Sequence, residues 1–150
     1  MLAMGARGGA VAALNTCPSR ADLEALKLQD PAVAIRTELG FRLNRRFSLQ
    51  PPPPMTNADL VLEIATTHWA IEATGIAEYG LKYEGRIKLI DRRRDVVLAH
   101  GICKASPPIA GNPLDCNDLV TNYRVELNES IRETAHYCGE DYRTRLLGLY

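Results

Sequence analysis

Three side chains capable of proton transfer lie in or beside apolar, strand-like segments of the chain. Glu63 interrupts the apolar run of residues 58–69, His68 lies near the end of that run, and His100 lies in a later apolar segment. Burial among apolar groups raises the pKa of a carboxyl group, and histidine titrates near neutral pH, so both can serve as a general acid or base. One hypothesis is therefore a small enzyme or ligand-binding domain that uses Glu63, His68 or His100 beside a sheet.

Each of these residues also has a structural interpretation. Glu63 can pair with Arg86 or Lys88 on a neighbouring strand, His68 can lie at a strand rim, and His100 can be a core histidine with satisfied hydrogen bonds. The sequence contains no GxSxG, no glycine-rich phosphate loop and no HExxH. We therefore predict no catalytic residue and no cofactor.

The densest run of charge is Arg92-Arg93-Arg94, which Asp91 and Asp95 flank. This run predicts either a partner-binding site for acidic groups or an ordinary solvated loop. The whole chain of 150 residues has 18 Lys and Arg and 18 Asp and Glu, a formal net charge of 0. A neutral chain has no overall field to attract nucleic acid or an anionic membrane, so we expect a protein partner and no nucleic acid.

Four cysteines could form disulfides or remain thiols: Cys17, Cys103, Cys116 and Cys138. No CxxC motif is present, which argues against a zinc ribbon or a redox pair, and we predict no metal site. In an exported protein, a Cys103–Cys138 or a Cys116–Cys138 disulfide is expected. Small buried free thiols are an equal alternative.

Residues 82–104 have the pattern of a β-hairpin, KYEGRIKLIDRRRDVVLAHGICK. With residues 91–94 as the loop, Ile87 pairs with Leu98, and six apolar side chains share one face. They are Tyr83, Ile87, Leu89, Val96, Leu98 and Ile102. Because the second strand is apolar on both sides, we predict that it is a central strand and that Leu98 is buried.

Two amphipathic helices are expected, over residues 31–46 and 117–138. Asp30 can cap the first, and Asp115 or Asn117 the second, which Gly139 would end. The apolar faces comprise Ile35, Leu39, Leu43 and Phe47 in the first helix, and Val120, Tyr123, Leu127, Ile131, Ala135 and Cys138 in the second. Short helices are expected at 20–27 and 140–147.

A strand with both faces buried is predicted over 58–69, an irregular link over 70–80, and a stiff connection at the four prolines 51–54. Together these elements predict an α+β fold. It is a two-layer sandwich with a mainly antiparallel sheet of three or four strands and two main helices on one face.

The first 18 residues are expected to be a flexible leader or a degenerate signal, followed by a single domain over 19–150. Leu14-Asn15-Thr16-Cys17 has the outline of a lipoprotein signal, but its apolar stretch is short and rich in Gly and Ala, so a lipid anchor at Cys17 is not favoured. No apolar run approaches the roughly 18 residues of a membrane-spanning helix, so none is predicted.

The string YEGRIKLIDRRRDVVLAHGICK resembles the R-L-(I/L)-D-x-(R/K)-x-x-x-V-L-x-x-G hairpin of uncharacterised bacterial envelope lipoproteins. As an order of elements, residues 30–138 are similar to the small α/β modules of curli-secretion lipoproteins, of activators of penicillin-binding proteins and of the TolB N-terminal domain. This resemblance implies a non-enzymatic binding or assembly module that acts through a protein partner in the periplasm or at the outer membrane. It assigns no functional residue. A cytoplasmic structural protein with free thiols is the further alternative.

Overall fold

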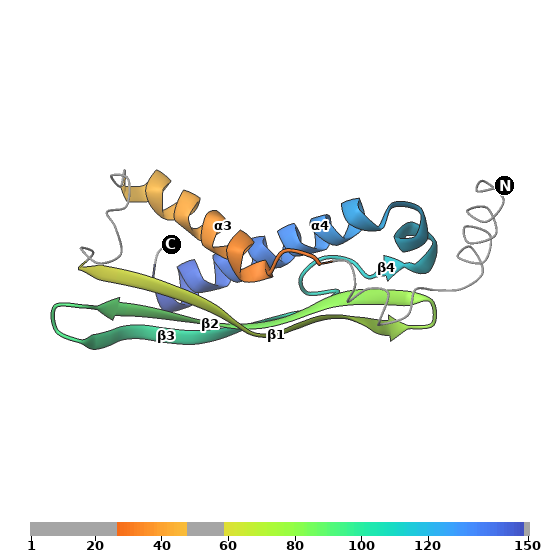
Figure 1. The fold of residues 1–150 in the computed structure, drawn as a ribbon. Coiled ribbons are helices and arrows are strands. Elements are labelled where there is room, and N and C mark those ends of the chain that lie inside the picture. The colour runs from red at the N-terminus through yellow and green to blue at the C-terminus, as the bar shows by residue number, and fades with distance from the viewer. Residues whose placement is uncertain (1–26, 48–58, 149–150) are drawn as a thin grey trace.

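The computed structural model describes residues 27–47 and 59–148, and they form two layers (Figure 1). Strands β1 (Leu60–Gly75), β2 (Glu78–Asp91) and β3 (Val96–Ala105) make an antiparallel meander, and β4 (Leu114–Asp115) pairs with β2. Helices α3 (Pro31–Phe47) and α4 (Cys116–Asp141) lie on one face of the sheet. The predicted α+β class, with two helices on one face of a mainly antiparallel sheet, is confirmed. Residues 1–18 and 51–54 lie outside the described residues, as does the expected helix 20–27 apart from Lys27.

Helix α3 follows its prediction closely. The Asp30 carboxylate accepts a hydrogen bond from the backbone N–H of Ala32 at 2.8 Å, as expected of an N-cap. Ile35 and Leu39 are fully buried, and Leu43 is half-buried. The apolar period of the sequence therefore identified the helix face that packs on the sheet.

Strand β1 is longer than predicted and continues into a hairpin instead of an irregular link. Residues 76 and 77 form a two-residue turn to β2, and Ala77 adopts a left-handed φ of 60°. A bulge between Thr66 and His68 shifts the alternation of side chains. Trp69 consequently lies on the side that packs on the helices, where Ile64 also lies. Only one face of β1 is buried.

The predicted register between β2 and β3 is wrong. Ile87 pairs with Gly101 and Tyr83 with Ala105, so small β3 residues face the helix layer opposite the large β2 residues. The turn is residues 92–95, one position later than expected, because Asp95 adopts a left-handed φ of 53°. A bulge near Leu89 displaces the register once more.

Strand β3 is therefore an edge strand, and β2 is the central one. Leu98, predicted to be buried, is 51% exposed, and Val96 and Ile102 are also exposed. Their apolar character had suggested a core strand. Ile102 instead lies on the outer face of the sheet, away from the helices, and Leu98 lies at a bulge.

Helix α4 is longer than predicted and begins with Asp115, whose side chain accepts a hydrogen bond from the Asn117 N–H at 2.7 Å. A kink at Asn122, with φ −149°, rotates the first turns, so that Leu119 is buried and Tyr123 is exposed. Gly139 does not end the helix. A Cβ at this glycine would lie 3.1 Å from Glu38 Cγ, so Gly139 allows close packing of α4 on α3.

The chain after α4 forms a π-helical turn, η2 (Tyr142–Leu146), where a short helix was expected. Tyr142 is fully buried and donates a hydrogen bond from its hydroxyl to the Gly85 carbonyl at 3.0 Å. Burial raises the pKa of Tyr142 well above its usual range, so the hydroxyl keeps its proton and acts as a donor. Leu146 packs over Gly101, where a Cβ would come within 2.5 Å of its side chain. The turn thus fixes the C-terminal part of the helix layer to β2 and β3.

Candidate binding surface

Two of the cysteines lie between the sheet and the helix layer. Cys103 of β3 and Cys138 of α4 form a disulfide with Cα atoms 5.7 Å apart, and both residues are buried. This is the first of the two pairings expected for Cys138. Cys116 is also disulfide-bonded, but not to Cys138. The Cys103–Cys138 bond fixes Cys103 on the helix side and therefore places Ile102 and Lys104 on the outer side of the sheet.

The three residues considered for proton transfer all lie on that outer face, away from the helices. Glu63 and His100 are exposed and flank Lys88 in one cross-strand row, about 10 Å apart at two strand spacings. His68 is exposed beside the β1 bulge, with Nε2 3.9 Å from Glu72 Oε1. The prediction of a core His100 is wrong, and Glu63 is not a buried acid but lies opposite Lys88, one of the two partners considered for it. The fold does not bring the three residues into one site.

The outer face of the sheet is mostly a ladder of charges. Lys82 Nζ lies 2.7 Å from Glu72 Oε2, and Lys104 Nζ lies 3.0 Å from Glu84 Oε2. Exposed pairs of this kind stabilise a protein by at most about 1 kcal/mol, so they mark a solvated surface. No helix of the described residues lies on this face (Figure 1).

The ladder gives way to aliphatic residues toward the β2–β3 turn. We define the hairpin arm as residues 60–62 and 89–98, which lie at this end of the sheet. In a folded monomer, exposed apolar side chains such as the outer-face row of Val61, Ile90 and Val97 indicate an interaction surface, whereas Leu62 packs against the core on the helix side. The aliphatic side chains of the arm are all at least partly exposed. They are Leu60, Val61, Leu62, Leu89, Ile90, Val96, Val97 and Leu98.

The three arginines form the tip of the hairpin arm. The carboxylate of Asp91 accepts hydrogen bonds from the backbone N–H groups of Arg93 and Arg94, at 3.0 and 3.2 Å, and thereby shapes the turn. Arg93 Nε also bonds Asp59 at 2.6 Å, yet the side chains of Arg93 and Arg94 are 76% and 80% exposed. A structured turn therefore presents cations to solvent.

Sequence reasoning identified the arginines but missed the aliphatic residues beside them, because it assigned Val96, Leu98 and Ile102 to the core. One signal could have corrected this. A Cys103–Cys138 disulfide requires Cys103 to face the helix layer, and alternation then places Ile102 outside. The predicted register and this disulfide were incompatible.

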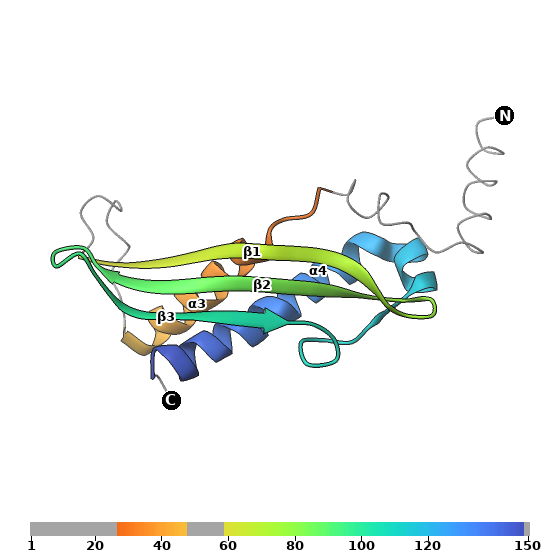
Figure 2. The same ribbon diagram turned by 90° about the horizontal axis from the view of Figure 1, so that it is seen from below.

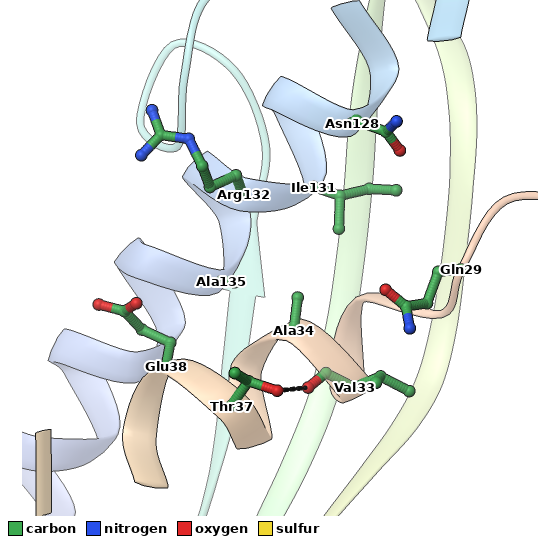
Figure 3. A pocket seen from close by; sticks show the side chains of 9 residues that line it. All are labelled: Gln29, Val33, Ala34, Thr37, Glu38, Asn128, Ile131, Arg132 and Ala135. Carbon is green, nitrogen blue, oxygen red and sulfur yellow. Dashed lines mark hydrogen bonds between the residues drawn. The ribbon is translucent and has the colours of Figure 1, made fainter. Parts of the chain in front are cut away.

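A groove lies between α3 and α4 (Figure 3). Ala34 and Ile131 line it from the two helices, with Val33 and Ala135 beside them. Its polar rim is Gln29, Thr37, Glu38, Asn128 and Arg132. The Thr37 hydroxyl donates to the Val33 carbonyl at 3.1 Å, and Arg132 bonds Glu129, so these two rim residues have partners within their own helices.

Ion pairs connect the two helices beside this groove. Arg42 donates from Nε to Glu38 at 2.7 Å, also bonds Glu140 of α4, and lies 2.9 Å from His136 Nδ1. The hydrogen bond from Arg42 holds the pKa of Glu38 below its ordinary value of 4.5. The bond from Arg143 lowers the pKa of Glu140 in the same way. This network holds α3 against α4.

Among the described residues, no three His, Cys, Asp or Glu side chains cluster as metal ligands would. No helix in the described ranges has the length and apolar character needed to cross a membrane. Comparisons of the chain with protein-family models, with curated proteins and with solved structures find no match. No relative therefore assigns a role to any residue.

Proposed function

We propose that this chain is a non-enzymatic binding module of the bacterial cell envelope that engages a protein partner through the hairpin arm. The observation that supports this proposal is the pairing of exposed aliphatic side chains with a cationic tip on one ordered hairpin. Val97 and Leu98 are 47% and 51% exposed beside Arg93 and Arg94. Protein interfaces combine an apolar centre with a polar rim, and arginine is enriched in them.

The order of residues along the hairpin arm favours protein over lipid. The arginines form the leading end, and the aliphatic residues lie behind them. A hairpin that inserts into a bilayer would have to carry these charges in first, at a cost of roughly 2.5–3.5 kcal/mol for each arginine that reaches the centre. A protein surface can instead offer carboxylates to the tip and apolar groups to the strands.

The proposed location of the protein in the periplasm, which is an oxidising compartment, rests on its cysteines. Cys103 and Cys138 are buried as a disulfide, and Cys116 is bonded as well. Structural disulfides persist in the periplasm and are rare in the cytoplasm of ordinary bacteria. This favours the envelope over the alternative of a cytoplasmic protein with free thiols.

Site-specific photo-crosslinking in the source cells tests the binding role. A photoreactive amino acid replaces Leu98 in the hairpin arm or, as a control, Val125, which is 57% exposed on α4. We expect a discrete protein adduct from position 98 and none from position 125. Absence of an adduct at 98, or the same adducts at both positions, would refute the proposal.

The arginines supply a second test, the triple change of Arg92, Arg93 and Arg94 to Ser. We expect the fold to survive, because exposed turn side chains change stability by about 0.5 kcal/mol or less each. Capture of the crosslinked partner should weaken, and the difference from wild type should shrink as salt rises, since salt screens exposed charges. Circular dichroism melting checks the fold. A salt-independent loss of capture would contradict a role for these charges.

A further inference from the structure

We propose that the open edge of β3 accepts an additional strand from the partner. The expected occupant is an extended, aliphatic segment that carries carboxylates at the end beside the arginine tip. This inference rests on the proposed binding function and specifies the chemistry of the partner.

The hydrogen-bonding groups of the β3 edge can be assigned. Strand β3 pairs with β2 on one side, and the described residues form no strand on the other. The carbonyl of Ile102 accepts a hydrogen bond from Arg145 Nη2 at 2.9 Å, so it points away from β2. Every second residue of an antiparallel strand directs its N–H and C=O to the same side, so those of His100 also point outward. Arg145 covers the edge at Ile102, and no strand among residues 27–47 and 59–148 pairs with the edge from Val96 to Gly101.

The helix layer leaves room for this strand. Packed helices lie about 8–10 Å apart, while neighbouring strands are about 4.8 Å apart, so two helices span roughly four strands. The main sheet has three. Figure 2 shows the helices crossing the sheet obliquely, with the C-terminal ends of α3 and α4 lying beyond β3 near the arginine turn. A fourth strand at this edge would lie under those ends.

The side chains at this edge select an apolar occupant. Val97, Leu98 and Ile102 are each about half exposed on or beside the outer face of β3. A neighbouring strand would pack its own side chains against them, since residues directly opposite on paired strands lie about 4.5–5.5 Å apart. Apolar residues in the occupant would cover surface that is now exposed to water.

Charge selects an acidic occupant. Residues 82–104 contain seven Lys and Arg and three Asp and Glu, a net charge of +4 in a chain whose net charge is 0. The opposite edge of the sheet differs, because residues 59–75 contain three Asp and Glu and no Lys or Arg. Most of this positive charge lies on β2 and on the arginine turn, with Lys104 on β3, so carboxylates are attracted to the turn end of the β3 edge and repelled from β1.

A second copy of the chain fits this place poorly. Its own β1 has suitable acidic and aliphatic residues, but two helices accompany that strand. With those helices on the same face of the sheet, the copy would overlap the ends of α3 and α4 that lie over the β3 edge (Figure 2). A single extended segment avoids this overlap.

The test removes one backbone donor from the edge. His100→Pro deletes an N–H that points away from β2, which an edge strand tolerates, and blocks pairing with a new strand. His100→Ala is the matched control because it removes the same imidazole and keeps the N–H. Thermal unfolding monitored by circular dichroism establishes that both variants fold.

A phage-displayed library of random decapeptides is the binding probe. Selection on the wild-type protein at low salt should enrich peptides that combine Val, Ile or Leu with Asp or Glu. A synthetic peptide of the enriched sequence should lose at least tenfold in affinity for His100→Pro, measured by fluorescence anisotropy, and change less than twofold for His100→Ala. Absence of enrichment, enrichment of basic peptides, or equal binding to His100→Pro would refute strand addition.

The crosslink at position 98 separates this inference from the function on which it rests. A partner adduct that persists in His100→Pro would refute strand addition and leave the binding role intact. No adduct in the wild type would refute the binding role itself. A dimer of the wild type in sedimentation velocity that His100→Pro abolishes would show that a second copy occupies the edge and would overturn the proposed occupant.

Discussion

Leu98 occupies a position that is unusual for a large aliphatic residue. It is a large aliphatic side chain, yet it lies half-exposed at the β3 bulge, while Ile87 on the neighbouring strand is buried. We expect Leu98→Ala to lower the free energy of unfolding by less than about 1 kcal/mol, and Ile87→Ala to lower it by about 2–5 kcal/mol. Urea unfolding measures both. Equal losses would mean that Leu98 belongs to the core.

Substituting alanine for glycine should have opposite effects on stability at two positions. A Cβ at Gly85 would lie 2.0 Å from the Tyr83 hydroxyl and 2.5 Å from its ring, whereas a Cβ at Gly40 in α3 would meet nothing within 4 Å. Gly85→Ala should therefore destabilise by about 1–3 kcal/mol through overpacking, and Gly40→Ala should stabilise by up to about 1 kcal/mol through helix propensity. Thermal melts decide both. A stabilised Gly85→Ala would exclude the close packing of Tyr83 over this glycine.

At the scale of elements, the helices were predictable and the strands only in part. Ile35 and Leu39 follow a 3.6-residue period that no local irregularity interrupts, so the face of α3 could be assigned from the sequence. In β1 the bulge before His68 changes which side of the sheet Trp69 faces. In β3 a bulge and the left-handed Asp95 shift the register and so change which side chains face the helices. Because strand alternation has a period of two, a single extra residue reverses the assignment of every later side chain.

The hairpin arm was likewise predictable only in part. The arginine turn was located because charge is visible in the sequence without any knowledge of register. The aliphatic half of the hairpin arm was not, since Val97 and Leu98 have the composition of core residues and only the register shows that they are exposed. Exposure depends on which elements cover a strand, and no local pattern in the sequence shows that β3 is an edge strand.

The contact between α3 and α4 should depend on pH. Arg42 and Arg143 lower the pKa values of Glu38 and Glu140 in the folded protein. Because these pKa values are depressed on folding, the stabilisation is complete above the ordinary value of 4.5 and is lost as the pH falls through the lowered values.

We therefore expect Glu38→Gln/Glu140→Gln to be less stable than wild type at neutral pH. The difference should vanish in acid, when the wild-type carboxylates are also protonated. Urea midpoints across this range measure the effect. A difference that stays constant with pH would show that packing, and not charge, is responsible.

For the molecule as a whole, the Cys103–Cys138 disulfide is the main covalent constraint that the described residues show. It closes a loop with a sequence separation of 35. A loop of this length is expected to stabilise the fold by about 3–4 kcal/mol, chiefly by restricting the unfolded chain. Cys103→Ala/Cys138→Ala should lower the urea midpoint accordingly, with Cys116 unchanged as the internal control. A midpoint equal to that of wild type would show that the unfolded chain is already compact.

The position of this disulfide also sets an order of events during synthesis. Strands β1, β2 and β3 all precede α4 in the chain. These strands can therefore leave the ribosome before α4, one of the two helices that pack on them, has been made. Cys138 is made 33 residues after β3 ends at Ala105, a delay of about 2–7 s at bacterial or eukaryotic elongation rates of roughly 5–20 residues per second. During that interval Cys103 is a nascent-chain thiol without its partner. The Cys103–Cys138 bond can therefore form only after Cys138 of α4 has been made and has reached the sheet.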